Sequence, residues 1–226
     1  MKTKQTIVCG LLAVMYALSL GACSGGGGEL KITGPTDSFK FEGRNSAWGV
    51  SKGTATEGAV NIPAGYRISA DYDYLPVIAI SSSAFAGCAG LTKITIPNSV
   101  TEIGANAFNR CTGLTKVTIP ASVTEIGSFA FIGCTGLTSI TIPESVTDIY
   151  SYAFSDCTSL TSITIPESVT EIGSGVFSGW TASQTIKIKG KANEAEADSA
   201  WGEGWRKRFE KMKWYDIDAK IVYQGK

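Results

Sequence analysis

Four of the six cysteines in the chain recur at intervals of 23 residues. Such an interval places them at one equivalent position in successive coils of a repeating structure. Zinc needs thiolate ligands that converge on one point, and a column of equivalent positions does not converge. Coils about 4.8 Å apart bring Cα atoms within disulfide range, but parallel side chains keep the Cβ atoms farther apart than about 3.8 Å. We therefore predict buried free thiols that act as small apolar side chains. They are Cys88, Cys111, Cys134 and Cys157.

Four carboxylates follow the same interval along the chain. A divalent cation would relieve repulsion between stacked like charges, but Ca²⁺ takes six or more oxygen ligands and each coil supplies one carboxylate. A glycosidase needs two carboxyl groups across a cleft, one with a raised pKa, and nothing in the pattern places such a pair. We expect a solvated acidic stripe and predict no metal site, with cation binding left as the open alternative. The four residues are Glu102, Glu125, Asp148 and Glu171.

Other catalytic chemistry finds little support in the composition. The chain contains no histidine, which is the commonest general base and the commonest metal ligand. We find no phosphate-binding loop in the sequence. Twenty basic residues balance twenty acidic ones, so no basic footprint for nucleic acid is visible. We therefore expect a protein that is not an enzyme, takes no cofactor and binds no nucleic acid.

Three aromatic residues are the best candidates for recognition of another protein. Phe129, Tyr150 and Tyr152 stand where other copies of the repeat described below carry asparagine or glycine. The repeat does not require them, and aromatic side chains are enriched at the hot spots of interfaces. Lys93 and Lys116 form a second candidate surface, among threonines that β-propensity explains by itself. Whether the aromatic positions or the lysine-bearing face binds a protein is left open.

A repeat of 23 residues organises the centre of the chain in four gapless copies. A half repeat from Val77 to Cys88 precedes them, and Asn61-Ile62-Pro63 matches one further step upstream. A single copy cannot bury its apolar face alone, so copies must stack, and three or more are needed for stability. The copies are Leu91 to Gly113, Leu114 to Gly136, Leu137 to Ser159 and Leu160 to Ala182.

The order of apolar and polar residues within a copy predicts the course of each coil. Leu91, Ile94 and Ile96 face the interior of a parallel strand, and the residues between them face outward. Pro97 ends the strand because proline has no N–H to donate. A second short extended stretch, then a small and a large core residue, are expected at Val100, Ile103, Ala107 and Phe108. The predicted fold is a β-rich leucine-rich-repeat solenoid with 23-residue coils, a parallel sheet, and N- and C-terminal caps.

The run from Ile140 to Ile149, followed by Ala153-Phe154 and Cys157, resembles the BspA-like leucine-rich repeat of bacterial surface proteins. The similarity covers Val77 to Ala182 closely. It departs from the common leucine-rich repeat, because serine fills the slot that normally holds asparagine or cysteine. The resemblance implies display on the cell surface, adhesion to host or neighbouring-cell proteins, and no enzymatic activity. The serines in this slot are Ser99, Ser122, Ser145 and Ser168.

The N-terminus has the character of a secretory leader. Met1 to Gln5 carries two lysines, and Ile7 to Leu20 is almost uninterrupted apolar sequence, too short for a comfortable transmembrane span. Leu20 to Cys23 resembles the lipobox of bacterial lipoproteins, which implies that Cys23 carries lipid and anchors the chain to a membrane. Ser24 to Gly28 is a flexible tether. We expect a lipid-anchored envelope protein at the outer membrane or cell surface, and a periplasmic scaffolding lipoprotein is the alternative.

The segment after the repeats changes character and predicts a C-terminal cap. Thr185 to Lys189 is expected to form a strand whose lysines protect a sheet edge. Aromatic residues at helical spacing between Asn193 and Met212 predict a short helix after Trp201. Ile217 to Tyr223 is expected to form a final strand.

The predicted organisation is a chain of five parts with a monomeric folded body. Its partners are an extracellular or envelope protein and, through Cys23, a membrane. The parts are a signal peptide at 1–22, a lipidated tether at 23–40, an N-terminal cap with the first irregular repeat at 41–90, four repeats at 91–182 and a C-terminal cap at 183–226.

Overall fold

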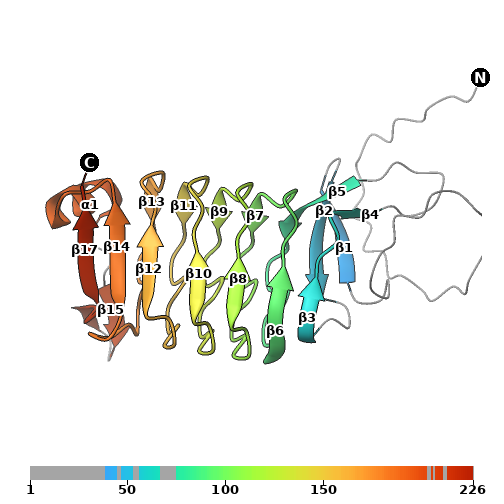
Figure 1. Ribbon diagram of the computed structural model, residues 1–226, viewed down its shortest axis with the longest axis horizontal. Helices are drawn as coiled ribbons and strands as arrows, with labels where there is room; N and C mark the ends of the chain where they lie inside the picture. The colour runs from blue at the N-terminus through green and yellow to red at the C-terminus, as the bar shows by residue number, and fades with distance from the viewer. Residues whose placement is uncertain are drawn as a thin grey trace, which may run out of the picture.

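The computed structural model describes residues 39–44, 47–52, 56–66, 75–202, 205, 207–210 and 213–225. Successive coils stack side by side along one long axis, so the described body is an elongated solenoid (Figure 1). The predicted signal peptide, Cys23 and the Gly/Ser tether lie outside the described residues. The division of the chain into five parts stays a prediction.

One parallel sheet runs along the stack with one strand from each coil. Paired residues are one repeat apart: Lys93 lies opposite Lys116, and Lys116 lies opposite Ser139. Its strands are β3 (Glu57–Asn61), β6 (Gly90–Thr95), β8 (Lys116–Thr118) and β10 (Ser139–Thr141). A separate parallel sheet follows it with β12 (Ser162–Ile165), β14 (Thr185–Lys189) and β17 (Lys220–Gln224).

The second short extended stretch expected in each coil is present and forms its own ladder. Its two-residue strands are β7 (Glu102–Ile103), β9 (Glu125–Ile126), β11 (Asp148–Ile149) and β13 (Glu171–Ile172), all parallel. They extend a sheet that begins with β1 (Phe39–Arg44), β2 (Ala47–Lys52) and β5 (Leu75–Ile80), and β4 (Gly65–Tyr66) pairs with β5. The β1–β2 hairpin is antiparallel, and β2 joins β5 in parallel.

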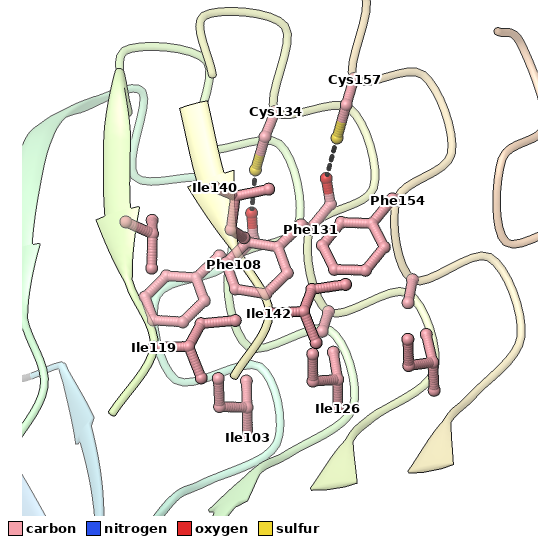
Figure 2. Packing of buried hydrophobic residues seen from close by; sticks show 14 of the residues in the cluster. Ile103, Phe108, Ile119, Ile126, Phe131, Cys134, Ile140, Ile142, Phe154 and Cys157 are labelled. Atoms are coloured by element: carbon pink, nitrogen blue, oxygen red, sulfur yellow. Dashed lines mark hydrogen bonds between the residues drawn. The ribbon is translucent and has the colours of Figure 1, made fainter. Parts of the chain in front are cut away.

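The interior consists of columns of identical side chains, as the repeat predicts. Five fully buried phenyl rings stack face to face, with centroids 5.5, 5.1, 5.5 and 6.4 Å apart. Figure 2 shows three of these rings beside the columns of isoleucine. Each stacked pair contributes about 0.5–1.5 kcal/mol beyond the burial of its area. The five residues are Phe85, Phe108, Phe131, Phe154 and Phe177.

The cysteine column is free and buried, in agreement with the prediction. The thiols of Cys111, Cys134 and Cys157 each donate to a phenylalanine carbonyl oxygen of the preceding coil, over 3.0, 3.1 and 3.2 Å. Figure 2 shows two of these bonds. Trp180 takes the slot in the last repeat, and its Nε1–H donates to the equivalent carbonyl oxygen, of Phe154, over 2.9 Å. A thiol and an indole therefore satisfy the same backbone acceptor.

The serine slot and the outward threonines also serve the stack. The hydroxyl of Ser122 donates to Val100 of the preceding coil over 2.6 Å, and Ser145 and Ser168 repeat this bond. Threonine hydroxyls on both sheets donate to the carbonyl oxygen one repeat earlier, as Thr138 does to Thr115 over 3.1 Å. These bonds give the polar positions of the repeat a structural role.

The C-terminal segment differs from two predictions. The helix, α1 (Glu194–Trp201), lies before Trp201 rather than after it. Asn193 accepts a bond from the Glu196 N–H and Glu196 accepts one from the Ala192 N–H, so a capping box starts the helix early. Gly202, with φ of 71°, ends it. The chain continues as a hairpin of β15 (Lys207–Glu210) and β16 (Lys213–Asp216).

The predicted strand at Thr185–Lys189 is present as β14, but it is not at the sheet edge. β17 pairs with it in parallel, because the chain returns after the hairpin to cover the exposed side of β14. Trp201 lies on the end of the stack, where its Nε1–H donates to Val169 over 3.2 Å. Trp201, Trp205 and Ile217 belong to the same core as the repeats. Within the described part of the chain, none of the helical structure has the length and apolarity required to span a bilayer.

Candidate functional site

A column of left-handed backbone runs along the turn that follows β7, β9 and β11. One residue per coil has φ between 57° and 65°. The short polar residues and glycine in this column tolerate that conformation. Phe129 and Tyr152 are bulky residues in the same conformation, where an L side chain is strained by about 1–2 kcal/mol. The members of the column are Ser83, Asn106, Phe129, Tyr152 and Gly175.

The two strained aromatic residues contact each other. The rings of Phe129 and Tyr152 stack with centroids 5.2 Å apart and an interplanar angle of 3°. Both side chains are half-buried rather than enclosed. The ring of Tyr152 extends over the next coil, because a Cβ built on Gly175 would lie 2.6 Å from its Cε1 atom. Gly175 therefore provides the space in which the tyrosine ring lies.

The stacked pair is dispensable for the coil itself. Asn106 and Gly175 occupy the same slot in neighbouring copies without an aromatic ring. Backbone strain that packing does not demand is typical of functional positions. Two of the three aromatic candidates from the sequence are thus brought together, at a partly exposed turn.

Tyr150, the third aromatic candidate, lies beside the acidic residues. Partial burial raises the pKa of its phenol, and the carboxylates of Glu125, Asp148 and Glu171 add to the rise, followed by that of Glu102. The four carboxylates are in register on adjacent strands, one per coil. The carboxylates at 102, 125 and 148 are half-buried and the one at 171 is exposed. A neutral phenol and a column of negative charges therefore share one surface.

Metal binding finds no support in the arrangement. Across the described ranges, no group of three or more acidic or cysteine side chains is placed to hold a metal ion. Burial is the first cause that raises the pKa of the Cys111 and Cys157 thiols, in each case to about 12, and it also raises that of Cys134. Thiols in that state are protonated at neutral pH and are poor metal ligands.

The lysine candidates lie on a different sheet. Lys93 and Lys116 are exposed and directly opposite each other on β6 and β8. The aromatic pair follows β9 and β11 of the other sheet. The structure therefore does not bring the two candidate groups into one site.

One hollow lies on the lysine-bearing side, where sequence analysis placed nothing. β10 and β12 belong to separate sheets, although β11 and β13 pair on the other side of the same coils. The space between β10 and β12 has a volume of about 560 Å³ and is lined mainly by threonine, serine and isoleucine. Lys189 bonds Glu144 over 2.7 Å at its rim, and both side chains are about half exposed.

The left-handed column has a sequence signal that the predictions did not use. Asn106 and Gly175, residue types that favour positive φ, fill the slot of Phe129 and Tyr152 in other copies. This would have indicated that the two aromatic residues share a strained turn. The stacking of their rings has no such signal, because it depends on side-chain directions across two coils.

The comparison with family models decides the affiliation. The model of the BspA type leucine rich repeat region matches residues 78–199 in six copies. The chain belongs to this family. Proteins of this family are bacterial cell-surface proteins that generally bind other proteins, and leucine-rich-repeat proteins of this kind are typically non-enzymatic binding modules.

Solved structures of bacterial repeat proteins are similar to this BspA-type chain. A leucine rich cell surface protein from Faecalibacterium prausnitzii has 35% identity and a TM-score of 0.61, over 71% of this chain and 45% of that one. The leucine rich repeat protein of T. pallidum has 32% identity and a TM-score of 0.62, over 69% of this chain and 70% of that one. A leucine-rich repeat protein from Bacteroides ovatus has 29% identity and a TM-score of 0.59, over 70% and 49%.

The chain therefore spans less than half the length of two of these three structures. Among curated proteins, none matches it.

Proposed function

We propose that this chain is an adhesin-like module that binds a protein through Phe129, Tyr150 and Tyr152, which we call the aromatic corner. The observation that carries the proposal is the stacked, half-buried pair of Phe129 and Tyr152 in left-handed backbone. Rings that are already ordered lose little side-chain entropy on binding, and aromatic residues dominate interface energetics. The partner is an extracellular or envelope protein.

The lysine-bearing face is the weaker candidate surface. Its threonine hydroxyls already donate to the preceding coil, as Thr115 does to Thr92 over 3.2 Å. Lys93 and Lys116 are long, exposed side chains, and ordering such chains costs entropy on binding. A partner there would meet few groups that are both free and rigid.

Attachment to the cell through Cys23 is part of the same proposal. The lipobox-like sequence and the glycine tether that follows it support a folded body held clear of a membrane surface. The folded body is proposed to be monomeric. A scaffolding role inside the periplasm is the alternative, and it would need the same aromatic corner to contact an envelope component.

The test uses substitutions that the repeat itself provides. Phe129→Asn with Tyr152→Gly installs the residues of Asn106 and Gly175 in the same slots, so the coil is retained. Lys93→Ser with Lys116→Ser installs the residue found at Ser139 and Ser162 and changes only the lysine-bearing face. The native protein and both variants are measured by surface plasmon resonance against immobilised host-matrix and envelope proteins.

We expect a bound partner to lose at least about tenfold in affinity with the aromatic variant, which is about 1.4 kcal/mol. The lysine variant should bind like the native protein. A partner that responds to the lysine variant and not to the aromatic variant would move the site to the sheet of β6 and β8 and refute the proposal.

A further inference from the structure

The aromatic corner and the four carboxylates Glu102, Glu125, Asp148 and Glu171, here called the acidic column, meet at Tyr150. Tyr150 follows Asp148 by two residues on the same coil and interacts electrostatically with all four members of the column. Two residues further on, Tyr152 begins the stacked pair with Phe129. Aromatic faces and negative charges therefore border one another on the turns that follow β9 and β11.

We propose that this surface recognises a basic polypeptide segment of the partner, rich in arginine or lysine, with its cations on the acidic column and its side-chain planes or stems on the aromatic corner. This inference rests on the proposed function and adds the chemistry of the partner. Charge complementarity carries it, because the column holds four acids and its register continues toward the N-terminus only through Ala79, an uncharged residue.

The geometry fits cationic side chains better than a metal ion. Carboxylates on neighbouring coils repeat about every 4.8 Å along the axis, so they form a line of charge rather than a cage. Ca²⁺ requires six or more oxygen ligands around one point. A guanidinium group binds a carboxylate through paired N–H donors and also stacks on an aromatic face, so arginine uses both components of this surface.

The lysine-bearing face cannot provide the same recognition, because it carries the opposite charge. Lys93 and Lys116 lie on the other sheet and would repel a basic segment. The charged face that complements a basic partner is thus the one that also carries the stacked rings. The two sides of the coil differ in charge, which orients the partner.

The test measures a fluorescein-labelled peptide of five Arg-Gly repeats and its Gln-Gly counterpart by fluorescence anisotropy, at low and at moderate salt. Glu125→Gln with Asp148→Asn neutralises the two column members flanking Tyr150. Glu144→Gln with Glu194→Gln is the matched control, since it removes the same charge from two exposed sites away from the column. The aromatic variant Phe129→Asn with Tyr152→Gly completes the set.

The arginine peptide should bind the native protein more tightly than the glutamine peptide, and salt should weaken it because exposed charges are screened. The column variant should weaken binding about tenfold and the control variant less than twofold, as expected for several exposed charge pairs lost together. Equal binding of the two peptides, or equal effects of the column and control variants, would overturn the inference.

Failure of the inference differs from failure of the proposed function. If a protein partner is lost with the aromatic variant but not with the column variant, the proposed function holds and the basic-segment inference is wrong. If the partner is unaffected by the aromatic variant, the proposed function itself is wrong, whatever the peptides do.

Discussion

Single residues at the end of each coil do one task with different chemistry. Cys111, Cys134 and Cys157 donate through sulfur, and Trp180 donates through its indole nitrogen, each to a phenylalanine carbonyl oxygen of the preceding coil. The cysteines are therefore donors as well as apolar fillers. Their conserved spacing within the chain follows from the backbone acceptor and requires no redox or metal chemistry.

The buried thiols should resist alkylation in the folded protein. Burial raises the pKa of Cys111 and Cys157 to about 12, so the reactive thiolate is scarce at neutral pH. Iodoacetamide should modify Cys88, Cys111, Cys134 and Cys157 only after denaturation, as intact mass spectrometry would show. Disulfide-linked pairs among them in the native protein would contradict the structure.

Tyr150 should titrate above an ordinary tyrosine. Partial burial and the carboxylates around it raise the phenol pKa above its usual value of 10, so the neutral form persists to higher pH. Glu125→Gln with Asp148→Asn should bring the pKa back toward 10, because it removes two of the charges that oppose ionisation. NMR titration of the tyrosine ring carbons measures both values, with Tyr152 as the internal comparison. An unchanged Tyr150 pKa in the double variant would separate this tyrosine from the acidic column.

At the scale of elements, the turn after each two-residue strand sets the recognition surface. β9 and β11 deliver Phe129 and Tyr152 into left-handed backbone, and the next coil leaves room for the tyrosine ring at Gly175. The glycine is therefore a positioning residue for Tyr152.

Gly175→Ala should displace that ring. The new Cβ would lie 2.6 Å from Tyr152 Cε1 and would also place alanine at a φ of 65°. Gly87→Ala is the matched control, since its φ is 72° and nothing lies within 4 Å of its Cβ. Chemical denaturation should show a loss of about 1–2 kcal/mol for the control, from backbone strain alone, and a larger loss for Gly175→Ala. Equal losses would mean that the Tyr152 ring moves freely.

The sequence predicted those features of the elements that recur in every copy. The inward strand residues, the second extended stretch and the phenylalanine column all follow from four gapless repeats, because stacking forces equivalent residues into contact. The helix was predicted after Trp201 because aromatic spacing was weighed above the capping box at Asn193 and Glu196. The separation of β10 from β12 has no sequence signal, since their repeats are nearly identical.

The candidate site was predictable only residue by residue. Phe129, Tyr150 and Tyr152 stand out because other copies lack aromatic residues in those slots. Their relation does not follow from spacing: Phe129 stacks on Tyr152, whereas Tyr150 faces the acidic column. Side-chain directions at a strained turn decide this, and a repeat pattern does not encode them.

At the scale of the whole molecule, a one-dimensional stack displays one narrow surface along its length. Such a surface can act outside the cell only if the body is held there. The lipobox-like cysteine and its tether provide the proposed attachment.

Cys23→Ser should release the protein from the membrane fraction of the producing bacterium, because the lipid acceptor is lost. Immunoblots of membrane and soluble fractions measure the change, and protease treatment of intact cells tests the side of display. Degradation of the native protein by external protease agrees with surface display, whereas full protection would support the periplasmic alternative. Unchanged membrane association of Cys23→Ser would exclude lipid as the anchor.

Hydrogen–deuterium exchange of the native protein, alone and saturated with the tightest partner from the binding measurements, tests the central claim most directly. We predict that binding slows amide exchange in peptides covering residues 125–131 and 148–154, which include Phe129, Tyr150 and Tyr152. Exchange in peptides covering residues 92–95 and 115–118 should not change. Protection confined to those strand peptides, with none at the aromatic corner, would contradict the account.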